Sequence, residues 1–226
     1  MSLITAALFD LDGTLIANED HVIDSYNESL EALNLPIASR QLLRNIQGKS
    51  FEVTAAEIGV PDSKLEEFAV IFWEKMAEFS TPPVVLPGVF ELLEFFYNNN
   101  IPMGILTNNR SNIAKNACSM AGLSKYFQHY LGSNDVKPKP AKDGIIALCE
   151  SLNVSPCSSV LYIGDSVSDV LAAHNAGVTG YGVCCMVDYE KRFTSEVIQY
   201  CKSVGCQFTH FLDSNDLVSW LKSKFN

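Results

Sequence analysis

The order of apolar and polar positions along the chain predicts three buried strands that each end in polar residues. The apolar runs cover 4–9, 102–106 and 160–163, with weaker candidates at 130–133, 178–184 and 206–211. Asp10 and Asp12 follow the first run, Thr107 follows the second and Asp165 follows the third. Each of the three strands therefore delivers polar side chains at its carboxyl end.

Helical patterns separate these runs from about residue 84 onward. Leu92, Leu93 and Phe96 recur at helical spacing, and Gly177 marks the end of a later helix. The predicted helices cover 89–97, 111–121, 141–152, 167–176, 194–203 and 214–224. This alternation predicts an α/β fold, a Rossmann-like and mostly parallel sheet with helices on both faces. Ligands bind such sheets in the crevice outside the carboxyl ends of the strands, where the polar residues lie.

The segment 17–83 differs from the rest of the chain because strand signals vanish there. Amphipathic helices are predicted at 18–34, 39–46, 51–58 and 63–79. We therefore expect two domains, a catalytic core formed by 1–16 and 84–226 and a helical cap domain formed by 17–83. Two short connections would leave this cap free to swing.

Composition and charge narrow the class of function. The chain has 226 residues with 47% hydrophobic and 19% charged positions, as a globular enzyme does. A formal net charge of -10 argues against nucleic acid or a membrane surface as a partner. The first residues lack a leader-like pattern, and the seven cysteines form no CxxC pair, so we expect a cytoplasmic protein with reduced thiols, as a monomer or homodimer.

Four motifs follow one another in the order of a known enzyme family. The string Leu8-Phe9-Asp10-Leu11-Asp12-Gly13-Thr14-Leu15 resembles the first motif of the haloacid dehalogenase-like hydrolases, most of which are magnesium-dependent phosphatases. The later motifs are matched by Gly104-Ile105-Leu106-Thr107-Asn108-Asn109, by Lys137-Pro138-Lys139-Pro140 and by Gly164-Asp165-Ser166-Val167-Ser168-Asp169. A helical cap between the first two motifs resembles the phosphoglycolate phosphatase and β-phosphoglucomutase-like group.

The carboxylates of these motifs predict a metal ion on physical grounds as well. Asp10, Asp12, Asp165 and Asp169 would converge on one crevice. Two carboxylates about 4 Å apart repel by about 4 kcal/mol at an effective dielectric of 20, and one lysine, Lys137, does not balance several such pairs. Some carboxylates are then protonated, or a hard cation lies among them. We expect Mg²⁺, since no cluster of His or Cys favours zinc.

The resemblance also implies catalytic roles. Asp10 would attack phosphorus and form an aspartyl phosphate, while Asp12 would act as general acid and base. Lys137 and Thr107 would hold phosphate oxygens by charge and by hydrogen bond. The metal ligands would be Asp10, Asp165 and the backbone carbonyl of Asp12.

Further residues are expected to support these groups. Backbone N–H groups of residues 11–13, Gly13 included, and of Asn108 would help to hold the phosphate. Asp169 would orient metal waters or Lys137, although an acidic residue also suits a helix N-terminus. Lys139 is expected to be a surface charge.

The resemblance implies that the cap contacts the leaving group through the loop 47–50. Lys49 would bind an anionic leaving group there, such as a carboxylate or a second phosphate, with a solvated lysine as the alternative. Arg44 and His21 are weaker candidates for the same role.

The sequence therefore predicts a phosphatase for a small phosphorylated metabolite. The resemblance alone makes phosphoglycolate the first substrate to consider. Sugar phosphates, nucleotides and pyrophosphate stay open. The alternatives are a phosphosugar mutase of the β-phosphoglucomutase type and a non-catalytic binding module on the same fold. A dehalogenase is disfavoured because it would not need Asp12 or a metal.

Overall fold

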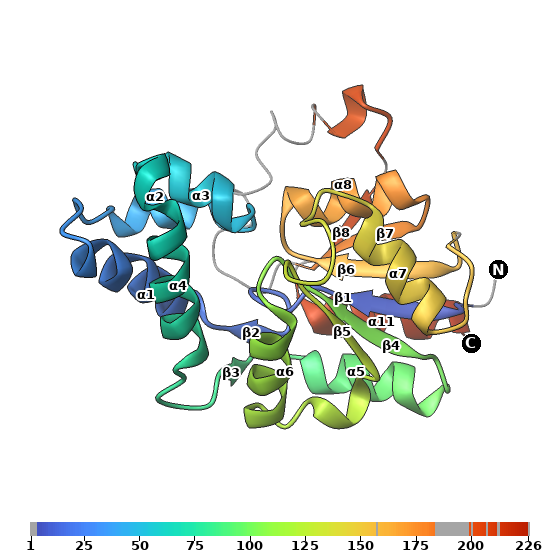
Figure 1. Cartoon of the computed structure of the whole chain (residues 1–226). Coiled ribbons are helices and arrows are strands. Elements are labelled where there is room, and N and C mark those ends of the chain that lie inside the picture. Colours follow the sequence, from blue (N-terminus) through green and yellow to red (C-terminus); the bar gives the residue numbers. More distant parts are fainter. Residues whose placement is uncertain are drawn as a thin grey trace.

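The computed structural model describes a sheet-and-helix core with a smaller group of helices beside it (Figure 1). The described residues are 4–156, 158–183, 199, 201–206, 208–211 and 213–225. The expected helix over 194–203 lies largely outside these residues. Within them, no helix combines the length and the apolar character that crossing a lipid bilayer requires.

Six parallel strands form the sheet of the core, in the order β5-β4-β1-β6-β7-β8. Their bounds are Ala6–Phe9 for β1, Met103–Leu106 for β4, His129–Leu131 for β5, Val160–Gly164 for β6, Thr179–Val183 for β7 and Phe208–Phe211 for β8. Strand β1 lies at the centre, where Leu8 pairs with Gly104 on one side and Tyr162 on the other. This confirms the predicted parallel sheet, and its central strands are fully buried as parallel strands commonly are.

Helices cover both faces of the sheet because successive side chains of a strand point to opposite sides. Ala7 and Phe9 of β1 pack in one apolar cluster with helices α5, α6 and α11. Ala6 and Leu8 pack in another with α7 and α8 (Figure 1). The helices are α5 (Val89–Asn98), α6 (Ser111–Met120), α7 (Asp143–Ser151), α8 (Val167–Ala176) and α11 (Ser214–Phe225), with a 3-10 turn at Ser124–Tyr126. Their bounds lie close to those predicted from periodicity.

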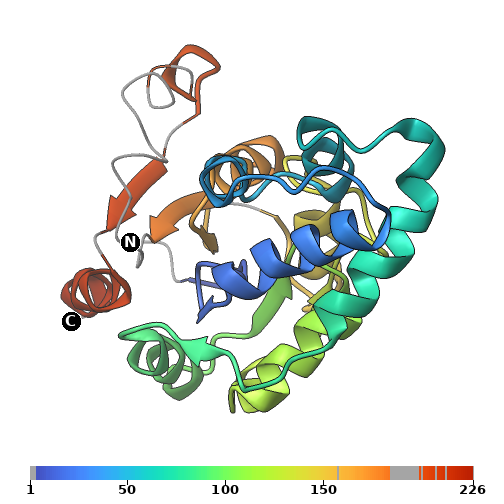
Figure 2. The ribbon, with the colours of Figure 1, turned by 90° about the vertical axis from the view of Figure 1, so that its left-hand side faces the viewer.

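The remaining helices, which we call the cap, pack around a separate apolar cluster that Ile113 of α6 also joins. They are α1 (Glu19–Ala32), α2 (Arg40–Asn45), α3 (Phe51–Glu57) and α4 (Leu65–Ala77), with a 3-10 turn at Asp62–Lys64. Helices α1 and α4 pack side by side in Figures 1 and 2. Aromatic rings fill the space between the helices, and the ring centroids of Tyr26 and Phe72 lie 4.2 Å apart.

Two short strands that periodicity does not reveal join the cap to the core. Strand β2 (Ile16–Ala17) runs antiparallel to β3 (Val84–Val85), and Ile16 lies opposite Val85. The expected domain boundaries fall at these two strands. We propose that this two-stranded ribbon is the hinge between core and cap.

Candidate active site

Strand β1 places Asp10 and Asp12 at the carboxyl edge of the sheet. The Asp10 N–H donates to the carbonyl of Ile163 at 2.8 Å, which extends the pairing with β6 by one residue. Leu11, between the two aspartates, is buried in the core, so the aspartates point the other way. Gly13 then turns the chain with a φ of +83°, in the left-handed region that glycine adopts without strain.

The lysine of the site is Lys139, so the expectation for Lys137 was wrong. Lys139 is 4% exposed, and its Nζ lies 2.7 Å from both Asp10 Oδ1 and Asp169 Oδ1. Lys137 is exposed at the surface. In an extended segment residues two apart share a side, so spacing alone does not distinguish Lys137 from Lys139. The chain turns at Lys139 and Pro140, and the Asn108 side chain binds the Lys139 backbone, which brings Lys139 rather than Lys137 to the site.

A side-chain amide fixes the backbone of Lys139. Asn108 Oδ1 accepts from the Lys139 N–H at 2.8 Å, and Asn108 Nδ2 donates to the Lys139 carbonyl at 3.2 Å. Asn108 follows strand β4, so one loop at the sheet edge positions another. The Asn108 side chain therefore positions Lys139, and no pattern in the sequence predicts this contact.

The charges on Lys139 and Asp10 follow from their neighbours. Burial alone would lower the pKa of Lys139, but the carboxylates of Asp10 and Asp169 outweigh it and raise that pKa well above its usual value. Lys139 is therefore charged. Burial raises the pKa of Asp10 well above its usual value. The Lys139 ammonium opposes this shift, whereas the carboxylates of Asp169 and Asp165 add to it. One ammonium thus leaves the acidic group with an excess of negative charge.

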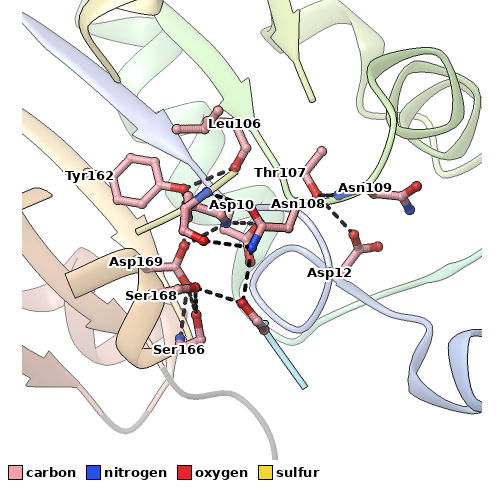
Figure 3. A network of polar contacts seen from close by, with 12 residues as sticks. Asp10, Asp12, Leu106, Thr107, Asn108, Asn109, Tyr162, Ser166, Ser168 and Asp169 are labelled. Atoms are coloured by element: carbon pink, nitrogen blue, oxygen red, sulfur yellow. Dashed lines mark hydrogen bonds and ion pairs between the residues drawn. The ribbon is translucent and has the colours of Figure 1, made fainter. Parts of the chain in front are cut away.

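Asp169 shares its two oxygens between the lysine and its own helix. Oδ1 accepts from Lys139 and lies 3.1 Å from the Tyr162 hydroxyl, which also lies 3.0 Å from the Leu106 carbonyl. Oδ2 accepts the Ser166 N–H at 2.9 Å at the start of α8. Asp169 therefore orients Lys139, rather than the expected Lys137, and stabilises a helix N-terminus at once. Figure 3 shows Asp169 beside Tyr162 and Ser166.

Asp12 lies on the other side of the site, with Thr107 and Asn109 near it (Figure 3). The Thr107 hydroxyl donates to Asp12 Oδ2 at 3.1 Å, and the Asn18 amide donates to Asp12 Oδ1. Burial raises the pKa of Asp12, while the hydrogen bonds from Asn18 and Thr107 lower it in part. Thr107 therefore contacts a carboxylate here, and its expected contact with phosphate stays a prediction.

The donor set fits a divalent cation. Asp10, Asp165 and Asp169 each offer a carboxylate oxygen, and these oxygens lie within 4.8 Å of one another. All three residues are buried, and oxygen ligands of this kind suit Mg²⁺. A Cβ at Gly13 would lie 2.5 Å from Asp165 Oδ2, so the turn after β1 packs directly against this carboxylate. The carboxylate of Asp12 is not part of this group, and metal binding by its backbone carbonyl stays a prediction.

The expected part of Gly13 in phosphate binding needs a correction. Its N–H donates to the Ile16 carbonyl at 2.9 Å within the turn, so this donor is already engaged. Gly13 instead contributes the close approach to Asp165 that a side chain would prevent. Hydrogen-bond geometry inside a tight turn leaves no pattern in the sequence.

A cavity of about 110 Å³ connects these residues with the cap. Asp10, Asp12, Lys139 and Asp165 line the core side, and Lys49 lines the cap side. The Lys49 ammonium pairs with Glu57 at 2.6 Å, so its expected role towards an anionic leaving group stays a prediction.

The two weaker candidates of the cap make other contacts and are not among the residues that line the cavity. Arg44 pairs with Glu19 at 3.2 Å. His21 Nε2 lies 3.2 Å from the Met76 carbonyl, and its ring packs on Phe79.

The loop 47–50 of the cap contacts the core next to the site. The Gly48 carbonyl accepts from Ser168 Oγ at 2.8 Å and from Asn108 Nδ2 at 3.2 Å. No sequence pattern predicts these contacts or those of Asn18 and Tyr162. Each involves a single polar side chain outside any periodic pattern, so only the folded chain shows where it lies.

Comparisons with known proteins agree with this arrangement. The family profile described as haloacid dehalogenase-like hydrolase matches residues 7–183. PpaX of Clostridium perfringens, whose name describes it provisionally as a pyrophosphatase, is 29% identical over 184 residues, which cover 80% of this chain and 84% of that protein. A phosphoglycolate phosphatase of Photorhabdus laumondii is 28% identical over 194 residues, 82% of each chain.

The fold itself has solved counterparts. SP0104 of Streptococcus pneumoniae, a haloacid dehalogenase-like family protein, superposes with a TM-score of 0.78 at 19% identity, over 98% of this chain and 100% of that chain. At this identity the likeness concerns the fold alone. The likeness in fold, the matched family profile and the four motifs at one cavity all indicate the same family. The chain is an enzyme of the haloacid dehalogenase-like hydrolase family.

Proposed function

We propose that this enzyme is a magnesium-dependent phosphatase that hydrolyses small phosphomonoesters through a phosphorylated Asp10. The observation that carries the proposal is that Asp10, Asp12, Lys139 and Asp165 line the same end of one cavity. Phosphoryl transfer needs a nucleophile, positive charge beside the phosphoryl oxygens and a proton for the leaving oxygen. The four side chains offer each of these functions at a cavity open to the cap.

The reaction divides into two displacements. A carboxylate oxygen of Asp10 attacks phosphorus, the bond to the leaving oxygen breaks, and Asp12 gives that oxygen a proton. Water then attacks phosphorus, Asp12 takes a proton from this water, and the bond to Asp10 breaks to release inorganic phosphate. Both aspartates return to their starting state.

Asp12 is suited to the proton transfers by its surroundings. Burial raises its pKa, which increases the fraction of protonated carboxyl near neutral pH. The hydrogen bonds from Asn18 and Thr107 hold the carboxyl in one orientation. Lys139 lies beside Asp10, where its charge stabilises negative phosphoryl oxygens.

Asp10, Asp165 and the backbone carbonyl of Asp12 would hold the metal ion. When bound, Mg²⁺ supplies a Lewis acid that withdraws charge from the phosphoryl oxygens. Asp169 holds Lys139 in place while the other carboxylates serve the ion.

The substrate and the setting belong to the same proposal. The names of the relatives support a small phosphorylated substrate, with phosphoglycolate and pyrophosphate among those to test. Cys118, Cys201 and Cys206 are buried thiols outside any disulfide, which supports a cytoplasmic location for the protein.

Activity on p-nitrophenyl phosphate tests the proposal. We expect Asp10→Asn to lower kcat by at least about 1000-fold, because removal of a nucleophile leaves only the binding contribution to the rate. Asp62→Asn, which changes an exposed carboxylate of the cap, is the matched control and should leave kcat unchanged. Chelation of Mg²⁺ should abolish the activity of the wild type, and added Mg²⁺ should restore it. Full activity of Asp10→Asn, or turnover without metal, would contradict the mechanism.

A further inference from the structure

The cap side of the cavity is mostly apolar. Val22, Tyr26, Phe72, Trp73 and Met76 line it, from helices α1 and α4. All of these except the half-buried Val22 are less than a tenth exposed. The leaving group of a substrate bound at Asp10 would therefore lie against aromatic and aliphatic side chains.

The charges around this wall disfavour an anion. Among the described residues that line the cavity, Glu19 and Lys49 are the charged ones of the cap, and the Lys49 ammonium is already paired with Glu57. Arg44, which could neutralise an anion, is instead paired with Glu19. Arg110 lies with its guanidinium 4.8 Å from the centre of the Trp73 ring and is not part of the lining.

A charged leaving group would consequently lose hydration without gaining a partner. A carboxylate or a second phosphate moved from water to an apolar surface costs several kcal/mol unless it is paired. The two charged residues of the cap that line the cavity, Glu19 and Lys49, are engaged in ion pairs with Arg44 and Glu57. An uncharged leaving group avoids this penalty and gains from the burial of its carbon atoms.

The volume of the cavity limits the size of the leaving group. An apolar cavity of about 150 Å³ is known to admit benzene. The cavity here has about 110 Å³ and must also hold the phosphoryl group next to Asp10. A leaving group of a few carbon atoms fits with the cap in this position, whereas aryl groups and nucleosides require the cap to open.

We propose that the substrate class of this enzyme is the phosphomonoester of a small, uncharged and largely apolar alcohol. This inference rests on the proposed function and goes beyond it, because it separates such esters from phosphorylated acids and from pyrophosphate. Thr54, which lines the cavity beside Tyr26, offers a hydroxyl rather than a charge to any polar atom of the alcohol.

A pair of substrates of equal size tests the inference. Isobutyl phosphate and phosphoglycolate have the same number of heavy atoms in the leaving group and differ in its charge. We expect the kcat/KM of the wild type with Mg²⁺ to be about tenfold higher for isobutyl phosphate, a factor that corresponds to about 1.4 kcal/mol. Equal values, or a preference for phosphoglycolate, would overturn the inference while leaving the phosphatase mechanism intact. If neither ester nor p-nitrophenyl phosphate is hydrolysed, the proposed function fails.

The two esters also differ in intrinsic reactivity, and this difference cancels when the ratio of their kcat/KM values is compared between the wild type and a variant of the apolar wall. Val22→Lys adds a cation to the half-buried edge of the cavity and should shift the ratio of the two kcat/KM values about tenfold towards phosphoglycolate. Val70→Lys, on the exposed face of α4, makes the same change away from the cavity and should leave the ratio unchanged. An unchanged ratio in Val22→Lys, or an equal shift in Val70→Lys, would overturn the assignment of this wall to the leaving group.

Discussion

Lys139 determines how the buried carboxylates of the site can coexist. Its ammonium lies 2.7 Å from oxygens of both Asp10 and Asp169, and all three side chains are almost fully buried. Buried charges require such partners, because the loss of hydration is otherwise uncompensated. The same ammonium is the positive charge that the phosphoryl group would meet first. Structure and chemistry therefore depend on one side chain.

Substitution of the two lysines of this segment separates them. We expect Lys139→Met to lower kcat by about 100- to 1000-fold, as the loss of one group that stabilises developing charge commonly does. It should also lower the free energy of unfolding by about 3 kcal/mol, because two buried carboxylates lose their partner. Steady-state kinetics and urea unfolding measure both effects.

Lys137→Met is the matched control, since it removes the same charge two residues away at the surface. Its kcat and unfolding free energy should stay within error of the wild type. If Lys137→Met instead abolished activity while Lys139→Met retained it, the placement of the lysine in the site would be refuted.

At the scale of residues, the sequence identified the aspartates and missed their partners. Asp10, Asp12, Asp165 and Asp169 belong to motifs that follow strand ends, so they could be selected from the sequence, and the carboxylates of Asp10, Asp165 and Asp169 lie together in the structure. The lysine could not be selected in this way, because Lys137 and Lys139 both precede a proline and only the path of the folded segment distinguishes them.

The loop between α2 and α3 is the element that joins the cap to the active-site edge of the core. The Gly48 carbonyl accepts hydrogen bonds from Ser168 at the start of α8 and from Asn108 after β4. A Cβ at Gly48 would lie 2.6 Å from the Ser166 side chain, so the loop approaches the core closely. These contacts exist only when the cap lies over the cavity.

Loss of one of these hydrogen bonds should shift the cap towards an open position. If only the closed form is competent, we expect Ser168→Ala to lower kcat/KM about fivefold, since a hydrogen bond contributes about 1 kcal/mol. Amide hydrogen exchange in residues 47–50 should become faster in the same variant. The two measurements together distinguish a change in closure from a change in chemistry.

Ser151→Ala serves as the control, because the Ser151 hydroxyl bonds within its own helix to the Ala147 carbonyl. It should change neither kcat/KM nor the exchange of the loop. An unaltered exchange rate in Ser168→Ala would rule out the role of this contact in holding the cap closed.

At the scale of elements, periodicity predicted the long helices and the central strands to within a few residues. Apolar spacing is strong in such elements because one face of each is buried. Strands β2 and β3 have two residues each, too few to show a period, and they were missed. The hydrogen bonds between them depend on the two ends of the cap meeting in space, which no local pattern records.

At the scale of the whole molecule, the active site contains more buried negative charge than one lysine compensates. Burial and three neighbouring carboxylates raise the pKa of Asp10, which shows the direction of this imbalance. A divalent cation would relieve the repulsion and would bind the folded chain only. Binding of this kind couples directly to folding.

Thermal unfolding should therefore respond to Mg²⁺. At a concentration of 100 times the Kd, the free energy of unfolding should rise by about 2.7 kcal/mol, and a chelator should reverse the change. Asp165→Asn should be more stable than the wild type without metal, because one repelling charge is gone, and should respond less to Mg²⁺. A melting temperature that ignores Mg²⁺ in the wild type would contradict a metal site at these carboxylates.

The pairing of β2 with β3 has a consequence for how such an enzyme can change. The polypeptide leaves the core and returns to it through two hydrogen-bonded neighbours, Ile16–Ala17 and Val84–Val85. A chain segment whose ends already touch can be replaced by another of different length at little cost in loop entropy. Exchange of the cap between relatives through this ribbon would thus provide new selectivity while the phosphorus chemistry of the core is inherited unaltered.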